Sequence, residues 1–251
     1  MISRRSFLGF AGLGTLAALW PLPVKAQSAA GFIPAQLRYR GGDWDPHPQY
    51  LAPIIQELGL RTSVEPAKDK RVISPLDPDL FFSPVLFMMG RYEFDPFTEQ
   101  ERAALRRFLT VGGFIFADDS LGTRGSGFDK SFREELKKIL PGHELKRLTG
   151  EHSVYRSFYL LKEIGGRVQV NPYLEGITFD NFTPVIYCQN DLAGAWARDS
   201  VGRWLYPAIP GGEAQRSQAF KTGVNIVIYA LTGEYKRDLI HHPFIKKRLG
   251  L

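Results

Sequence analysis

Short apolar runs alternate along the chain with segments whose apolar residues recur at helical spacing. The apolar runs predict strands at 37–39, 62–64, 85–89, 114–117 and 183–188. The helical spacing predicts helices at 49–58, 98–112, 129–140 and 220–231. Apolar strands that alternate with amphipathic helices are typical of a sheet whose strands run parallel and are covered on both faces. The pattern therefore predicts an α/β domain with a mostly parallel sheet.

One unit within this pattern carries clear local signals. Thr98 and Glu101 have the spacing of a capping box, which begins a helix. The next strand, 114–117, leads directly into Asp118 and Asp119. Two acidic residues are thus expected at the carboxyl end of a buried strand.

The segments between these elements are predicted from their polar residues. The charged, proline-containing stretch 65–79 is expected to be a long surface connection. The glycine-rich stretch 122–127 is expected to be a flexible surface loop, with anion binding by its amides and Arg124 as the alternative. Asp129 then has the place of a residue that caps the next helix.

Ligands of open parallel sheets bind beyond the carboxyl ends of the strands, where the sheet holds the loop side chains in place. The candidate site residues at these positions are Asp43, Trp44, Arg91, Asp118, Asp119, Ser120, Asn190 and Asp191. A carboxylate close to a buried sheet must be hydrogen-bonded, paired or metal-bound, because its desolvation is costly. A ligand-binding role for Asp118 or Asp119 therefore stands beside a structural one, in which the acid caps the next turn. Pairing with Arg91 or Arg124 is a second structural explanation.

The start of the chain has the order of an export signal. Arg4 and Arg5 precede an uncharged apolar run of 13 residues, which is shorter than the ~20 residues that cross a bilayer. Small residues follow, and cleavage is predicted after Ala26. The sequence thus predicts a twin-arginine signal peptide at 1–26 and one α/β domain at 27–251, exported to the periplasm. The twin-arginine translocase is an expected partner, and no stable membrane anchor is expected after cleavage.

Composition narrows the possible partners. The chain is 44% hydrophobic and 23% charged, which is ordinary for a globular protein. Its net charge of +6 includes Arg4, Arg5 and Lys25, so the predicted mature domain carries only +3 and is not expected to bind nucleic acid.

The single cysteine, Cys188, follows an apolar run and is expected to be a small buried side chain. The five histidines include no pair at the usual zinc spacing, so no structural zinc site is expected and no metal is assigned, while a mixed site of carboxylates and histidine stays open as an alternative.

Several stretches resemble known families. The segment 98–116 resembles the class I glutamine amidotransferase-like superfamily, and this resemblance implies a flavodoxin-like, three-layer α/β sandwich. The chain resembles more closely an uncharacterised bacterial family, DUF4159. The matching stretches are 38–44 (Arg-Tyr-Arg-Gly-Gly-Asp-Trp), 98–116, 152–159 and 190–196 (Asn-Asp-Leu-Ala-Gly-Ala-Trp).

The chain departs from the amidotransferases at the position of their nucleophile. The resemblance to that superfamily implies a cysteine on a sharp turn after this strand. That cysteine would be the nucleophile that attacks the amide of glutamine. Here Asp118 and Asp119 take that place, and a carboxylate does not form the required thioester. Glutaminase activity is therefore not expected. Members of the smaller family also occur as domains of membrane-anchored proteins, which favours a role in the cell envelope.

These observations lead to two functional expectations. The first is a periplasmic ligand-binding or envelope accessory protein with an envelope protein as partner. Its ligand cleft would lie around Asp43, Trp44, Arg91, Asp118, Asp119 and Asp191. The alternative is a hydrolase acting on a polar substrate such as a glycan, in which Asp118 or Asp119 is the general base or holds a divalent cation. In that case Trp44 and Trp196 would be platforms for sugar rings. The pattern indicates no particular cofactor.

Overall fold

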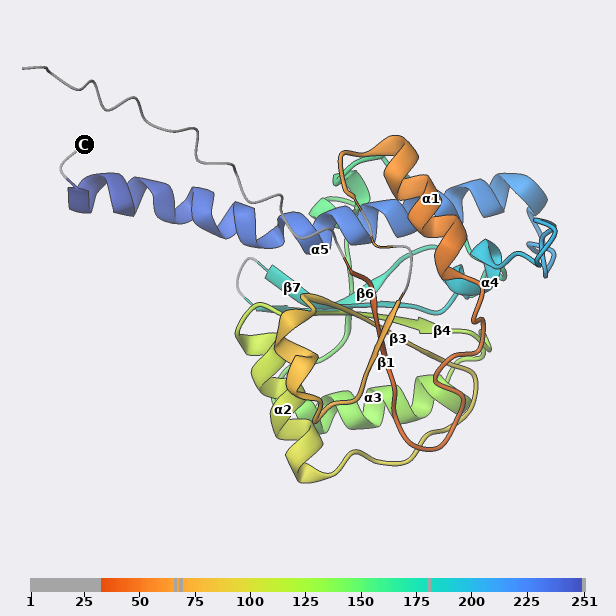
Figure 1. The fold of residues 1–251 in the computed structure, drawn as a ribbon, viewed down its shortest axis with the longest axis horizontal. Helices are drawn as coiled ribbons and strands as arrows, with labels where there is room; N and C mark the ends of the chain where they lie inside the picture. Colours follow the sequence, from red (N-terminus) through yellow and green to blue (C-terminus); the bar gives the residue numbers. More distant parts are fainter. Residues whose placement is uncertain (1–32, 66, 68–69, 180–181, 250–251) are drawn as a thin grey trace, which may run out of the picture. The chain divides into compact units, whose positions relative to one another are not determined.

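The computed structural model describes residues 33–65, 67, 70–179 and 182–249, with side chains up to residue 232 (Figure 1). The strands are β1 (Ala35–Leu37), β2 (Arg71–Ile73), β3 (Val85–Gly90), β4 (Phe114–Asp119), β5 (Lys146–Arg147), β6 (Glu175–Phe179) and β7 (Phe182–Cys188). The α-helices are α1 (Leu51–Arg61), α2 (Glu99–Thr110), α3 (Gly127–Ile139), α4 (Leu192–Trp196) and α5 (Gly212–Leu249). Two short 3₁₀ helices lie at Pro78–Phe82 and Ser153–Arg156.

The strands form one mixed sheet in the order β2-β1-β3-β4-β7-β6-β5. The first five strands in this order run parallel, whereas β6 and β5 run antiparallel to their neighbours. The predicted α/β domain with a mostly parallel sheet is therefore confirmed. As a consequence of the parallel pairing, the carboxyl ends of β1, β3, β4 and β7 meet at one edge, beside α4 in Figure 1.

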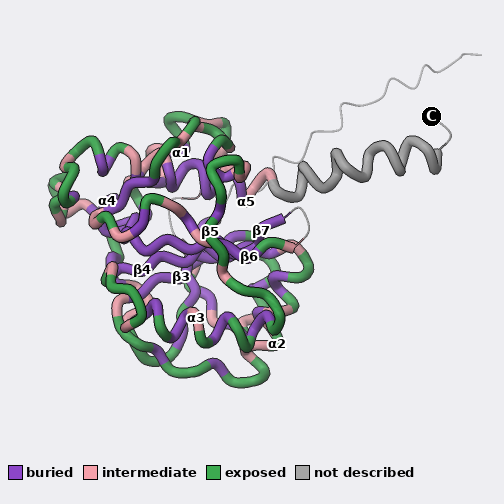
Figure 2. Tube along the Cα trace, turned by 180° about the vertical axis from the view of Figure 1, so that it is seen from behind, coloured by how far each residue is buried: buried purple, intermediate pink, exposed green. Residues whose placement is uncertain are grey.

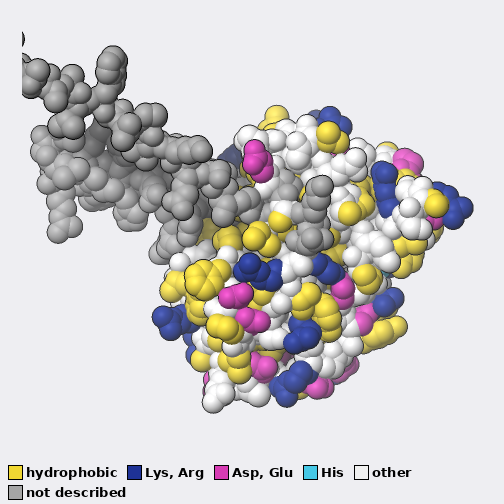
Figure 3. Space-filling view, in the orientation of Figure 1, with side chains coloured by type: hydrophobic (Ala, Val, Ile, Leu, Met, Phe, Trp, Pro, Cys, Tyr) yellow, Lys and Arg dark blue, Asp and Glu magenta, His cyan; other side chains and the backbone are white. Residues whose placement is uncertain are grey.

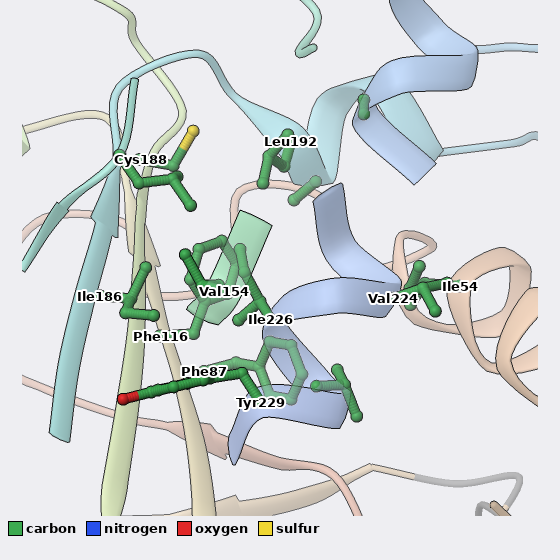
Figure 4. Packing of buried hydrophobic residues seen from close by; sticks show 14 of the residues in the cluster. Ile54, Phe87, Phe116, Val154, Ile186, Cys188, Leu192, Val224, Ile226 and Tyr229 are labelled. Carbon is green, nitrogen blue, oxygen red and sulfur yellow. The ribbon is translucent and has the colours of Figure 1, made fainter. Parts of the chain in front are cut away.

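Helices cover both faces of the sheet, and the central strands β3 and β4 are buried along their whole length (Figure 2). Successive side chains of a strand point to opposite faces. Phe87, Phe116 and Ile186 accordingly point toward α5 (Figure 4). Their neighbours, such as Ile115, belong to a second apolar cluster under α2 and α3. This alternation decides which face each polar residue at the strand ends must occupy.

The capping box that the sequence predicts at the start of α2 is confirmed. The Thr98 hydroxyl accepts from the amide of Glu101 at 3.2 Å, and the Glu101 carboxylate accepts from the amide of Thr98 at 2.6 Å. The expected cap by Asp129 is wrong, because Ser126 is the residue before α3 and Asp129 lies inside its first turn. There Asp129 accepts from the Tyr187 hydroxyl at 2.8 Å instead.

Two strand predictions are wrong at the side of the sheet formed by β1 and β2. The stretch 62–64 is not a strand, and β2 lies at Arg71–Ile73, inside the predicted surface connection. The first strand lies two residues earlier than the predicted range 37–39. Strands of three residues carry too little periodicity to be recognised, and their pairing with neighbours decides where they form. The antiparallel pair of the two-residue β5 and the five-residue β6 was not predicted either.

The predicted signal peptide, with Arg4, Arg5 and the cleavage after Ala26, lies outside the described residues. Within the described part of the chain, no helix combines the length and the apolar character that a membrane span requires. Side chains of both charge signs lie interspersed on the face shown in Figure 3.

Candidate functional site at the strand ends

The candidate residues fall into three groups at the carboxyl edge of the parallel strands. Asp118 and Asp191 meet at the amino end of α4, Asp43 pairs with Arg91, and Asp119 lies on the opposite face of the sheet from Asp118. Asn190 is used structurally, because its side-chain oxygen accepts from the amides of 170 and 171 at 2.9 and 2.8 Å.

Asp118 caps α4 from the neighbouring strand. Its two carboxyl oxygens accept from the amides of Leu192 at 3.1 Å and Ala193 at 2.8 Å. These amides are among the first of the helix and have no partner within it. Burial, with a further contribution from the charge of Asp191, holds the pKa of Asp118 well above its usual value. Both oxygens of Asp118 are therefore committed to the fold.

Asp191 is the buried centre of a larger network. It adopts the left-handed conformation (φ 52°) and accepts from the amide of Gly194 at 2.9 Å. The same oxygen lies 3.0 Å from Nε2 of His47, and the other oxygen accepts from Nε of Arg167. Asp191 and His47 are almost completely buried, whereas Arg167 remains 25% exposed. The only solvent-facing member of this ionic group is thus Arg167.

Arg167 and His47 are site residues that the strand-end argument did not select. Arg167 also donates to the carbonyl oxygen of Ser120 at 3.2 Å, so it spans the ends of β4 and β7. His47 could have been found, because it lies in the Pro-His-Pro turn after the first strand. Arg167 follows Gly165 and Gly166 in a segment without periodicity, and nothing in its local sequence marks it. The two glycines allow a close approach that a Cβ would prevent, since one at Gly165 would lie 2.2 Å from backbone atoms of α5.

Asp43 and Arg91 form an ion pair beside this network. The Asp43 carboxylate accepts from both the amide and Nε of Arg91, at 2.6 and 2.5 Å. The pKa of Arg91 is raised, mainly by the hydrogen bond to Asp43 and further by the charge of Asp43, although burial opposes this effect. Tyr206 belongs to the Asp191 network, since its ring lies 5.1 Å from that of His47 and 5.8 Å from the Arg167 guanidinium. Trp44 is half-buried against the cluster under α2 and α3.

Asp119 is the least satisfied of the candidate carboxylates. One oxygen accepts from the amide of Leu121 at 2.9 Å, as the turn-capping explanation predicts, but Oδ2 is buried without a hydrogen-bond partner. Burial raises the pKa of Asp119 to about 7, and the nearby loop amides only partly oppose this effect. Asp119 can therefore gain or lose a proton near neutral pH.

Three further buried polar atoms near the strand ends lack partners. They are Oγ of Ser120, Nε2 of Gln189 and Nδ1 of His47. Ser120 follows β4 directly and Gln189 follows β7, which are neighbouring parallel strands. Buried polar atoms without partners are few in native proteins and indicate a bound water, ion or ligand.

The structure bears on two expectations, the pairing of Asp118 or Asp119 with an arginine and the role of Trp196 as a platform for a sugar ring. Arg91 pairs with Asp43, while Arg124 binds the carbonyl oxygen of Val170 at 2.9 Å, so neither pairs with Asp118 or Asp119. Trp196 is 1% exposed and belongs to the core, which excludes it as a platform for a sugar ring.

The structure also bears on the reactivity of the Cys188 thiol and on metal binding. Cys188 is fully buried on β7, and burial together with the charge of Asp118 raises its pKa, so it is a neutral thiol. Among the described residues, no three His, Cys, Asp or Glu side chains are arranged to hold a metal ion.

The fold and the site together define an α/β domain whose parallel strands end in carboxylates and which has no accessible thiol at that edge. Comparison with known families identifies it further. The chain belongs to the family described as a domain of unknown function (DUF4159), whose profile matches residues 34–231. No curated protein matches the sequence significantly.

Proposed function

We propose that this chain is an exported periplasmic protein that binds a small polar ligand, or an envelope partner, at the carboxyl edge of its parallel strands. The observation that carries the proposal is the set of buried polar atoms without partners at the ends of the neighbouring strands β4 and β7, on Asp119, Ser120 and Gln189. Each unsatisfied buried polar group costs roughly 1–3 kcal/mol, so a molecule that satisfied several of them would be held firmly. The set mixes donors and acceptors, which suits a neutral polar ligand.

We also propose that the domain has a flavodoxin-like, three-layer fold of the amidotransferase-like type, which would favour a ligand site at the strand ends. The five parallel strands β2-β1-β3-β4-β7 have the order 2-1-3-4-5 when numbered along the chain, which is the flavodoxin-like order. In folds of that type, ligands bind at the strand ends. Glutaminase activity is not part of the proposal, because the end of β4 carries Asp118 and Asp119 and the thiol of Cys188 is buried.

The binding proposal predicts that a molecule is retained through Ser120 and Gln189. Native mass spectrometry of the mature protein purified from periplasm should show an additional bound mass. The Ser120→Ala/Gln189→Leu variant should lose at least nine tenths of it. Ser83→Ala is the matched control, because its Oγ is equally buried and unpartnered but lies just before β3, at the opposite edge. An unliganded wild-type protein that also crosslinks to no envelope protein would contradict the proposal.

One observation favours the hydrolase as a second candidate. Asp119 has a pKa of about 7 and a carboxyl oxygen without a partner, which are properties of a general acid or base. Asp118 does not fit this role, because both of its oxygens hold helix amides. An assay with ester and glycoside substrates decides between the candidates. Turnover with an inflection near pH 7 that is lost in Asp119→Asn would favour the hydrolase, and turnover lost with a chelator would add a divalent cation.

The proposed export route predicts a strong effect of the two signal arginines. Arg4→Lys/Arg5→Lys should reduce the processed protein in the periplasm at least tenfold and leave the precursor in the cytoplasm, because twin-arginine signals require the arginine pair. Fractionation of spheroplasts measures this. Arg38→Lys/Arg40→Lys makes the same change within the domain and should leave export intact. Normal processing of the first variant would show that another export route is used.

A further inference from the structure

A groove lies on the face of the sheet covered by α1, α4 and α5, and it shares no lining residue with the strand-end site. It runs between α1 and α5, which pack against each other (Figure 1), and Arg198 and Trp204 of the 198–204 hairpin also line it. Its volume is about 340 Å³, which is within the range of small-molecule sites.

The floor of the groove is aromatic. Tyr159, Trp204 and Phe220 line it and are each partly exposed, and the rings of Trp204 and Phe220 lie 5.8 Å apart. Half-exposed aromatic rings that face a common groove offer a surface for an apolar or planar ligand body.

Four cations and two carboxylates, those of Glu57 and Glu213, line the groove, so the net charge of its lining is positive. Two of the four lining cations are paired, Arg61 with a carboxylate one helical turn away and Arg216 with Glu213, each at 3.0 Å. For Arg198 and Lys221, by contrast, the described residues place no carboxylate within 4.0 Å. Lys221 lies 6.0 Å from the centre of the Tyr159 ring. Arg198 and Lys221 thus lie beside the aromatic rings without a carboxylate partner among the described residues.

Arg198 is held against Trp204, and its Nε has no acceptor among the described residues. Its guanidinium stacks on Trp204, with the central carbon 3.9 Å from the ring centre, and its Nε is buried without a hydrogen-bond partner. Arg216 supports Trp204 from 4.3 Å, and its own guanidinium is used by the carbonyl oxygens of Ala195 and Tyr206 at 2.6 and 2.7 Å. A guanidinium held in this way is preorganised for a carboxylate, to which it can donate two parallel hydrogen bonds.

We propose that this groove binds a small organic carboxylate, with its anionic group on Arg198 and Lys221 and its apolar body on Trp204 and Phe220. The charge of the ligand follows from the unpaired cations, and its size follows from the volume of the groove. The proposal does not depend on the function of the strand-end site.

The test compares three probes that share a ring and differ in charge, namely 3-phenylpropionate, 3-phenylpropionamide and phenethylamine. Titration into ¹⁵N-labelled protein of residues 27–251 should shift the amide signals of Arg198, Phe220 and Lys221 and the indole signal of Trp204. The carboxylate should bind at least tenfold more tightly than the amide, and the amine should bind least.

Variants locate the charge that selects the carboxylate. Arg198→Gln should remove the tenfold preference and Lys221→Gln should reduce it, so that either variant is informative if the other folds poorly. Arg203→Gln is the matched control, because Arg203 lies in the same hairpin, 80% exposed and paired with Asp199. Equal affinity for the acid and the amide, an unchanged preference in both groove variants, or the absence of a saturable shift at these signals would overturn the proposal.

Discussion

Asp191→Ala should destabilise the domain by about 3–5 kcal/mol, because it removes the centre of a buried ionic network. The carboxylate binds Arg167, His47 and the amide of Gly194 at once, and the residue is fully buried. Removal leaves a positive charge and a ring nitrogen without their acceptor, and alanine is also strained in the left-handed conformation that position 191 adopts.

Urea unfolding of the mature protein at pH 7 measures this effect. In a domain of this size, the expected loss lowers the melting temperature by roughly 6–20 °C. Asp191→Asn should lose clearly less, because asparagine tolerates the left-handed conformation and its oxygen can still accept from the Gly194 amide. Asp199→Ala removes an acid from a surface ion pair with Arg203 and should have little effect. A similarly small effect of Asp191→Ala would show that the network does not stabilise the fold.

Compared with the wild type, the Asp119→Asn variant should gain stability as the pH rises. In the folded protein the pKa of Asp119 is about 7, whereas its usual value is 3.8. The folded state therefore holds a proton that the unfolded state has lost between these two values, and the wild-type protein loses stability as the pH rises from about 4 to 7. The difference between the two pKa values corresponds to a loss of up to roughly 4 kcal/mol.

The measurement compares unfolding free energies of the variant and the wild type at pH 4 and pH 8. The variant has no proton to lose, so its stability relative to the wild type should increase across this interval. Titration of Asp118 affects both proteins and cancels in large part, because the charge of Asp119 is the smallest of the contributions that shift the pKa of Asp118. Asp199→Asn should show little change across this interval, because hydrogen bonds from Arg203 lower the pKa of Asp199 below its usual value of 3.8, so that this residue titrates at lower pH. A difference that does not change with pH would show that Asp119 titrates normally in the folded protein.

The elements with strong local patterns could be predicted from the sequence. The capping box of Thr98 and Glu101, the wholly apolar β3 and the run that ends in Asp118 and Asp119 were all found in this way. These features depend on residues within a few positions of one another, where backbone geometry dictates the spacing. The three-residue strands β1 and β2 were placed wrongly, because they depend on pairing with strands far along the chain.

The candidate site was predicted in part. Asp118, Asp119 and Asp191 were predicted as site residues from their positions at the ends of strands, but they were expected to line one cleft. The tertiary structure assigns them different partners, because neighbouring residues of a strand face opposite sides of the sheet. Asp118 and Asp191 meet the amino end of α4, whereas Asp119 faces the helices on the other side.

Apolar spacing and local capping act over short stretches of chain, so the fold class, the strand that ends in two acids and the burial of Cys188 could be predicted from the amino acids alone. Which charges meet depends on how the strands are assembled. His47 and Asp191 are 144 positions apart, and Arg167 joins them from a segment without a pattern of its own. Such partnerships arise because a buried charge must find a partner when the sheet is assembled, and the order of the strands determines which partners are within reach.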